Sequence, residues 1–134
     1  MTATSDGSIP ILTEQDIVLS RQAVRKLAQQ LKFSLVDQTK MITAASELSR
    51  NTLVYGGGGT LHWELLEDGL HTGLRLRFED NGPGIADLNL AMTDGWTSGS
   101  GMGMGLSGSK RLVNEFEIRS VVGEGTCVTI TRWK

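Results

Sequence analysis

The chain has 134 residues and a formal net charge of −2 at neutral pH, a length typical of one domain, so we expect a single domain over residues 1–134. Because the charges are balanced and no basic block occurs, nucleic acid and membrane surfaces are not expected as partners. The sequence predicts a cytoplasmic protein for three reasons. It has one cysteine, Cys127, a polar stretch at residues 1–8, and no run close to the roughly 20 apolar residues that a membrane span needs.

The first half of the chain predicts a short strand and two helices. Residues 9–12 are expected to form an edge strand, since Pro10 cannot donate a hydrogen bond to a central ladder. Thr13 and Ser34 are each followed three residues later by Asp, which is typical of helix N-caps, so we expect helices at about 13–31 and 34–54. Four glycines at 56–59 then end the second helix. The side chains expected in the core are Ile17, Leu19, Ala23, Val24, Leu27 and Leu31 on the first helix, and Met41, Ala44, Ala45, Leu48 and Thr52 on the second.

The second half predicts two hairpins with a loop and a helix between them. The first hairpin is expected to have strands at 60–66 and 72–78 with a turn at 67–69. A loop at 81–103 follows, with at most one helical turn near 88–92, and then a helix at 104–116 that carries Leu106, Leu112 and Val113. The second hairpin is expected to have strands at 118–122 and 126–133 with a turn at 123–125. The order βααββ, loop, αββ lacks regular βαβ alternation. It predicts an α+β two-layer sandwich, with helices on one face of a mixed, mainly antiparallel sheet.

Glu47 and Asn51 are the first residues that suggest chemistry. They are four residues apart on the second predicted helix, so they project from one face, beside the apolar stripe. A carboxylate there can polarise a hydroxyl or a water molecule, and a carboxamide oxygen suits Mg²⁺. For this pair alone, a solvated helix face remains the alternative.

Asp80 ends a predicted strand and is followed by Asn81-Gly82-Pro83-Gly84. An acceptor at a strand end, next to glycines that allow close backbone approach, suits recognition of a flat base with an exocyclic amine. An ordinary strand-ending turn is the alternative.

Alternating glycines occupy residues 99–105, directly before a predicted helix. Exposed backbone amides and the positive helix end together suit a phosphate, whereas a flexible linker is the alternative. Residues 103–108 formally match GxGxxG, but the dinucleotide-binding motif requires a preceding hydrophobic strand, and residues 96–101 are rich in Gly and Ser. A Rossmann site is therefore not expected, and no Walker A motif occurs.

Other polar residues have simpler interpretations. His62 and His71 have no cysteine or carboxylate at ligand spacing, so no metal site is expected there. Arg21, Arg25 and Lys26 are interpreted as a solvated helix face, with docking of a partner as the alternative.

The helical Glu-x-x-x-Asn, the Asp-x-Gly-x-Gly and the Gly-x-Gly-x-Gly-Leu motifs, in this order, resemble the N, G1 and G2 boxes of the GHKL superfamily of ATP-binding proteins, which have the Bergerat fold. The resemblance covers nearly the whole chain. The stretches 11–18, 36–38, 46–51 and 110–116 look like those of RsbT-type proteins, the serine/threonine switch kinases of the bacterial stressosome.

This resemblance implies ATP and Mg²⁺ as cofactors and a role for each motif residue. Glu47 would be the general base on the acceptor hydroxyl, and Asn51 the Mg²⁺ ligand. The nucleotide-binding residues implied are Asp80 for the adenine amine, Gly82 and Gly84 for the base pocket, Gly101, Gly103 and Gly105 for the phosphates, and Thr126 near the adenine. The implied reaction is phosphoryl transfer to serine or threonine of STAS-domain scaffold proteins, followed by release and activation of a PP2C-type phosphatase or another effector.

Two positions depart from related patterns. Val54 stands three residues after Asn51, where sensor histidine kinases often carry a basic residue, and residues 85–98 are short for an ATP lid, so modest nucleotide affinity is expected. Two alternatives share the fold: an anti-sigma factor of the RsbW/SpoIIAB type, and a nucleotide-gated interaction module with a vestigial ATP site. The presence of Glu47, Asn51 and Asp80 argues against the vestigial site.

Overall fold

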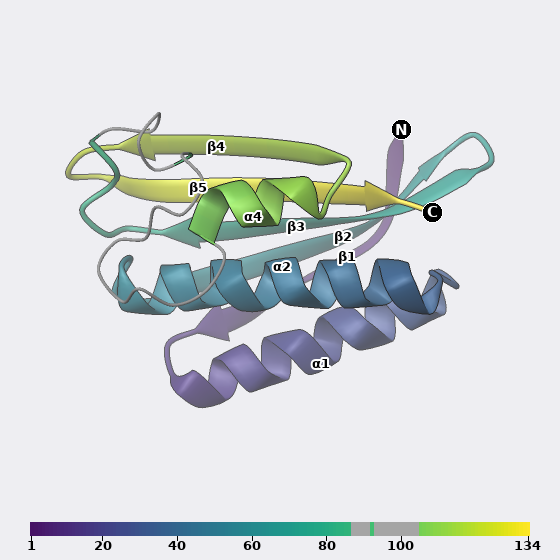
Figure 1. Cartoon of the computed structure of the whole chain (residues 1–134), viewed down its shortest axis with the longest axis horizontal. Helices are drawn as coiled ribbons and strands as arrows, with labels where there is room; N and C mark the ends of the chain where they lie inside the picture. Colours follow the sequence, from purple (N-terminus) through teal and green to yellow (C-terminus); the bar gives the residue numbers. More distant parts are fainter. Residues whose placement is uncertain (87–91, 93–104) are drawn as a thin grey trace.

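The computed structural model describes residues 1–86, 92 and 105–134. Two long helices and one short helix accompany five strands in these residues (Figure 1). In chain order the elements are β1 (Thr2–Ile11), α1 (Glu14–Gln30), α2 (Leu35–Val54), β2 (Gly59–Asp68), β3 (His71–Asp80), α4 (Gly105–Arg111), β4 (Glu115–Val121) and β5 (Gly125–Trp133). The predicted order of elements is confirmed.

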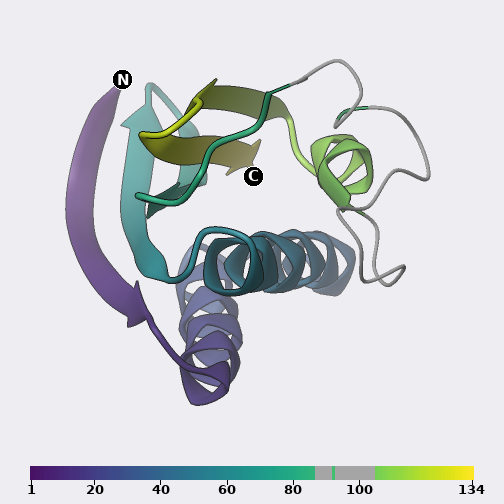
Figure 2. The same ribbon diagram turned by 90° about the vertical axis from the view of Figure 1, so that its left-hand side faces the viewer.

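The five strands form one sheet in the order β1-β2-β3-β5-β4, and neighbouring strands in it are antiparallel. Along β3, buried Leu74, Leu76 and Phe78 alternate with residues on the outer face, as expected for a sheet covered on one side. Figure 2 shows the sheet curving around α2, with α1 on the side of β1 and α4 on the side of β4. The predicted α+β sandwich is therefore confirmed, whereas the single domain over residues 1–134 stays a prediction.

Helix α2 supplies the centre of the core. All five of its residues predicted to face inward are buried: Met41, Ala44, Ala45, Leu48 and Thr52. The four apolar ones pack with residues from β2, β3 and β5 on the inner sheet face. The buried stripe of α2 reaches Thr52, one turn before the glycine run. The C-terminal end of α2 is therefore packed against the sheet where β3 ends.

Both predicted helix starts are confirmed. The Thr13 hydroxyl accepts a hydrogen bond from the Asp16 amide at 3.2 Å, and the Asp16 carboxylate accepts one from the Thr13 amide at 3.1 Å, forming a capping box. The Ser34 hydroxyl accepts from the Asp37 amide at 3.1 Å. At the other end of α2, Gly57 and Gly58 have φ values of 74° and 105°, which lets the chain turn directly into β2.

Several predicted boundaries and burials are wrong. Strand β1 has ten residues rather than four, because its pairing with β2 extends back to Thr2. On α1, Leu19 is 44% exposed rather than buried. Ala23 and Leu31 are half-buried.

The third helix was predicted to reach residue 116 but ends at Arg111. Phe116 and Ile118 instead alternate with exposed Glu115 and Glu117 in β4, which pairs with β5. Most of the predicted loop at 81–103 lies outside the described residues, as does its predicted helical turn at 88–92 except for Met92. No helix in the described part of the chain is long and apolar enough to span a membrane.

Candidate functional site

Three chain segments distant in sequence meet at Asp80. A Cβ atom on Gly56, just after α2, would lie 2.4 Å from Asp80 Cγ. A Cβ on Gly125, at the start of β5, would lie 2.1 Å from the Asp80 carbonyl oxygen, and one on Gly82 would lie 2.7 Å from Gly56 Cα. No side chain fits at such distances, so glycine at these positions allows the three segments to close around Asp80.

The Asp80 carboxylate is held in a fixed orientation. Its Oδ1 accepts hydrogen bonds from the Gly82 amide at 2.9 Å and from the Thr126 amide at 3.2 Å. Among the described residues, no hydrogen bond to Oδ2 is seen, and the side chain is half-buried. One carboxylate oxygen is thus anchored by the backbone, and the other can accept a hydrogen bond from a ligand.

The loop after Asp80 is docked on the turn between β4 and β5. The Pro83 carbonyl accepts from the Gly123 amide at 2.8 Å, and the Ile85 amide donates to Ser120 Oγ at 2.7 Å. Gly84 has φ 76°, and a Cβ there would lie 2.5 Å from the Val121 carbonyl oxygen. Both predicted glycines of this loop therefore serve close packing, although the structure does not test their contact with a base.

Thr126 joins the same site. Its amide donates to Asp80, and its Oγ1 lies 2.8 Å from Ser120 Oγ on the neighbouring strand. The structure therefore brings together the predicted residues Asp80, Gly82, Gly84 and Thr126. Gly56, Ser120 and Gly125 were not predicted as site residues. The glycine run at 56–59 contains Gly56 and the Gly-x-Gly turn at 123–125 contains Gly125, whereas neither signal includes Ser120.

Glu47 and Asn51 lie one turn apart on α2 and are both half-buried. The residues that follow them, Leu48 and Thr52, are buried, so the pair sits at the edge of the core as predicted. The Asn51 carbonyl accepts from the Tyr55 amide at 3.0 Å and the Gly56 amide at 3.1 Å, which links this turn of α2 to the residue packed on Asp80. A carboxamide beside a carboxylate, both partly accessible, fits the oxygen ligands that Mg²⁺ prefers.

The predicted phosphate loop is mostly beyond the described residues. Gly101 and Gly103 lie outside them, and Gly105 is the first residue of α4, whose Leu106 is buried in the core. Across residues 1–86, 92 and 105–134, no group of three or more His, Cys, Asp or Glu is placed to hold a metal ion. His62 Nε2 lies 3.9 Å from Glu79 Oε1.

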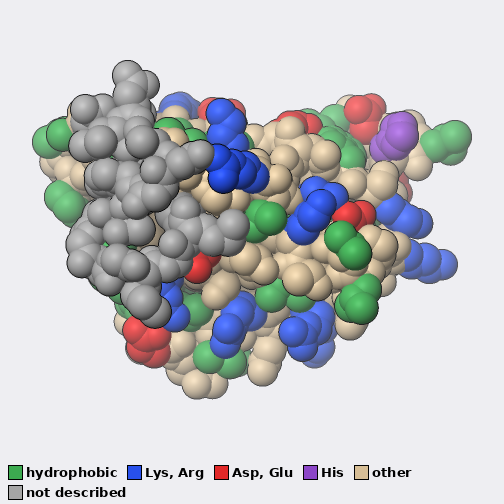
Figure 3. Space-filling model, viewed as in Figure 1, with side chains coloured by type: hydrophobic (Ala, Val, Ile, Leu, Met, Phe, Trp, Pro, Cys, Tyr) green, Lys and Arg blue, Asp and Glu red, His purple; other side chains and the backbone are tan. Residues whose placement is uncertain are grey.

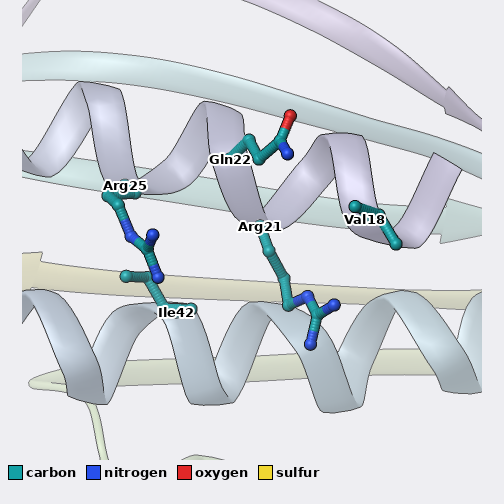
Figure 4. Close-up of a pocket in the computed structure, with 5 residues that line it drawn as sticks. All are labelled: Val18, Arg21, Gln22, Arg25 and Ile42. Atoms are coloured by element: carbon teal, nitrogen blue, oxygen red, sulfur yellow. The ribbon is translucent and has the colours of Figure 1, made fainter. Parts of the chain in front are cut away.

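A separate hollow lies between α1 and α2. Figure 4 shows Arg21 and Arg25 extending from α1 toward α2, where Ile42 lies; Val18 and Gln22 complete the lining. Figure 3 shows that basic side chains also gather over the two long helices on this side of the molecule. None of the five lining residues belongs to the Asp80 site.

Comparison with known proteins identifies the family. Residues 36–134 match the family of histidine kinase-, DNA gyrase B- and HSP90-like ATPases. The chain is 45% identical over 125 residues to the serine/threonine-protein kinase RsbT of Bacillus subtilis (strain 168), covering 93% of this chain and 94% of that protein. The chain belongs to the RsbT family of serine/threonine-protein kinases. As a kinase of this ATPase superfamily, the RsbT-family chain uses ATP.

Two solved structures share the fold. The structure of the RsbU and RsbW domains of Rv1364c from Mycobacterium tuberculosis aligns with 96% of this chain, at a TM-score of 0.67 and 20% identity, and the match spans 32% of that longer chain. The mycobacterial sensor histidine kinase MprB aligns with 96% of this chain and 97% of its own, at a TM-score of 0.55 and 15% identity. At these identities the likeness concerns the fold alone.

Proposed function

We propose that this RsbT-family kinase transfers the γ-phosphoryl group of ATP to a serine or threonine hydroxyl of a STAS-domain scaffold protein. The observation that carries the proposal is the Asp80 carboxylate, anchored through Oδ1 by two backbone amides at 2.9 and 3.2 Å. Such an acceptor, fixed before the ligand arrives, needs no reorganisation to receive the amino group of adenine.

Base recognition would follow from hydrogen-bond chemistry. Adenine presents an amine to Asp80 Oδ2, whereas guanine and hypoxanthine present a carbonyl oxygen at the same position. An ionised carboxylate has no proton to donate, so a 6-oxo purine would place two acceptors against each other. Thr126, next to Asp80, would face the same edge of the base, and Gly82 and Gly84 would shape the pocket.

Phosphoryl transfer would use residues on α2 and the glycines of residues 101–105. Glu47 would take the proton of the acceptor hydroxyl while the oxygen of that hydroxyl bonds to the γ-phosphorus. The bond from the γ-phosphorus to the β–γ bridging oxygen would break, and ADP would leave. Asn51 would hold Mg²⁺, whose charge offsets that of the phosphates. Gly101, Gly103 and Gly105 would supply backbone amides to the same phosphates.

Membership of the RsbT family supports the choice of partners. We expect the kinase to phosphorylate a STAS-domain protein and, once released, to bind and activate a PP2C-type phosphatase or another effector. An anti-sigma factor of the RsbW/SpoIIAB type would also phosphorylate an antagonist, and a stable complex with a sigma factor would distinguish it. A purely nucleotide-gated binding module would bind its partner without transferring phosphate.

The test is transfer of labelled γ-phosphate from Mg-ATP to the cognate STAS-domain protein, alongside ATP binding measured by calorimetry. We expect Asp80→Asn to abolish both binding and transfer, and Glu47→Ala to keep binding while abolishing transfer. Asp68→Asn, a matched change at an exposed carboxylate in the β2–β3 turn region, should alter neither. Unchanged transfer in Glu47→Ala would remove Glu47 as the base, and normal ATP binding by Asp80→Asn would overturn the assignment of the base site.

A further inference from the structure

Ser120 faces Thr126 across the β4–β5 hairpin and joins three parts of the site. The two residues are direct partners in the antiparallel ladder, which places their side chains on the same face (strands β4 and β5 in Figure 1). Ser120 Oγ lies 2.8 Å from Thr126 Oγ1, 3.2 Å from the Gly125 carbonyl oxygen and 2.7 Å from the Ile85 amide nitrogen. One half-buried hydroxyl thus contacts both residues that begin β5 and the residue that follows Gly84.

The three contacts determine the direction of each hydrogen bond. A serine hydroxyl has one proton to donate and two lone pairs to accept with. The Ile85 amide can only donate, and the Gly125 carbonyl can only accept. All three bonds form together only if Ser120 donates to Gly125 and accepts from both Ile85 and Thr126. In that arrangement the Thr126 proton points at Ser120, and Thr126 Oγ1 offers only lone pairs to a ligand.

We propose that Ser120 is a positioning residue that holds the Thr126 hydroxyl as an acceptor and thereby helps select a purine with a 6-amino group. The inference rests on the proposed function, because it assumes that the base lies against Asp80 and Thr126. With both side chains acting as acceptors, a 6-amino base finds two compatible groups, and a 6-oxo base finds two that repel it. Without Ser120, the Thr126 hydroxyl can rotate and donate to a 6-oxo group.

The experiment measures binding of ADP and of inosine diphosphate to the whole chain by calorimetry, since the two ligands differ only in the base and no acceptor protein is needed. We expect the wild type to favour ADP. Ser120→Ala should lower the ratio of the ADP affinity to the inosine diphosphate affinity by about tenfold. This is the discrimination associated with one hydrogen bond of this kind. Ser120→Thr, which keeps the hydroxyl on a strand that suits a β-branched residue, should keep most of the ratio.

A matched control lies on β5, the strand that carries Thr126. Thr131 Oγ1 accepts from Arg75 Nε at 3.2 Å, away from the base site, so Thr131→Val removes a cross-strand polar contact of β5 without touching Thr126. We expect it to leave the ratio unchanged. If Ser120→Ala does not fold, Ser120→Cys, with a weaker donor and acceptor of similar size, should lower the ratio by a smaller factor.

The outcomes separate the two proposals. A wild type that binds neither nucleotide, or binds both equally, would overturn the proposed base site. Preference for ADP in the wild type with an unchanged ratio in Ser120→Ala would leave that site intact and overturn the role of Ser120. Equal weakening of both ligands would make Ser120 a structural residue only, which also contradicts the proposal.

Discussion

The ion pair between Asp37 and Arg132 gives a stability prediction whose size follows from the structure. Arg132 Nη2 donates to Asp37 Oδ1 at 2.6 Å, and Arg132 Nη1 donates to the Leu112 carbonyl at 3.0 Å. The side chains are 15% and 26% exposed for Arg132 and Asp37 respectively. The pair therefore connects the first turn of α2, the inner face of β5 and the end of α4, and both side chains are largely shielded from solvent.

Asp37→Asn would leave the Arg132 guanidinium partly buried without its anion. Loss of a charge-assisted hydrogen bond of this kind costs about 1.5–3 kcal/mol, and loss of an acid from the first turn of a helix adds about 0.3–1 kcal/mol. We therefore expect the free energy of unfolding at pH 7 to fall by about 2–4 kcal/mol, measured by urea denaturation. The control is Glu14→Gln, which removes a first-turn acid of α1 and an exposed pair with Arg50 at 3.7 Å; it should cost less than about 1 kcal/mol.

The same pair predicts a pH dependence. Its hydrogen bond with Arg132 holds the pKa of Asp37 below its usual value, against a smaller opposing effect of burial. A depressed folded-state pKa contributes stability that is fully present above the unfolded pKa of about 3.9 and is lost as the pH falls through the folded pKa. The difference between wild type and Asp37→Asn should thus be constant from pH 7 to 5 and shrink below about pH 4. A difference under about 0.5 kcal/mol at pH 7, or one that does not shrink in acid, would refute this reasoning.

Two further predictions concern the glycines of the site and the basic face of α1. Gly125→Ala should abolish ATP binding, because Gly125 has φ 127° and a Cβ there would lie 2.1 Å from a backbone oxygen. The control Gly123→Ala, at φ 84° and in open space, should lower the free energy of unfolding by about 1–2 kcal/mol and keep ATP binding. Equal ATP binding by both variants would contradict this prediction. Arg21→Glu combined with Arg25→Glu should weaken binding to the STAS-domain protein or the effector without changing the affinity for ATP. If a pull-down titration shows unchanged partner affinity, the hollow between α1 and α2 does not take part in docking.

Local signals in the sequence predicted most of the fold. Thr13 and Ser34 mark helix starts because their side chains satisfy backbone amides that no helix can satisfy internally, and the stripe on α2 is buried as its spacing predicts. The end of the third helix failed for a physical reason. Residues 112–118 carry apolar side chains that fit both helical spacing and alternation, and pairing with β5, a long-range interaction, decides for the strand.

The candidate site shows the same limit. The motif residues Asp80 and Thr126 were predicted as parts of one nucleotide site through the family resemblance, and the structure places them in contact through a hydrogen bond of 3.2 Å. The contributions of Gly56, Ser120 and Gly125 could not be predicted, because they depend on the distance between segments separated by dozens of residues. Spacing within a motif reports on local geometry; it does not report which backbone atoms approach from elsewhere.

Under the proposed function, those unpredicted residues would prepare Asp80 to discriminate between bases. A carboxylate at a strand end has two side-chain torsions, and immobilising such a group on binding costs about 0.5–1.5 kcal/mol. Here the two amides on Oδ1 fix its orientation, while Gly56 and Gly125 bring α2 and β5 against it closely enough to keep those amides in place. The cost of ordering Asp80 is therefore met during folding. Under the proposed function, the choice between an amine and a carbonyl on the base would then be expressed fully in the affinity for the nucleotide.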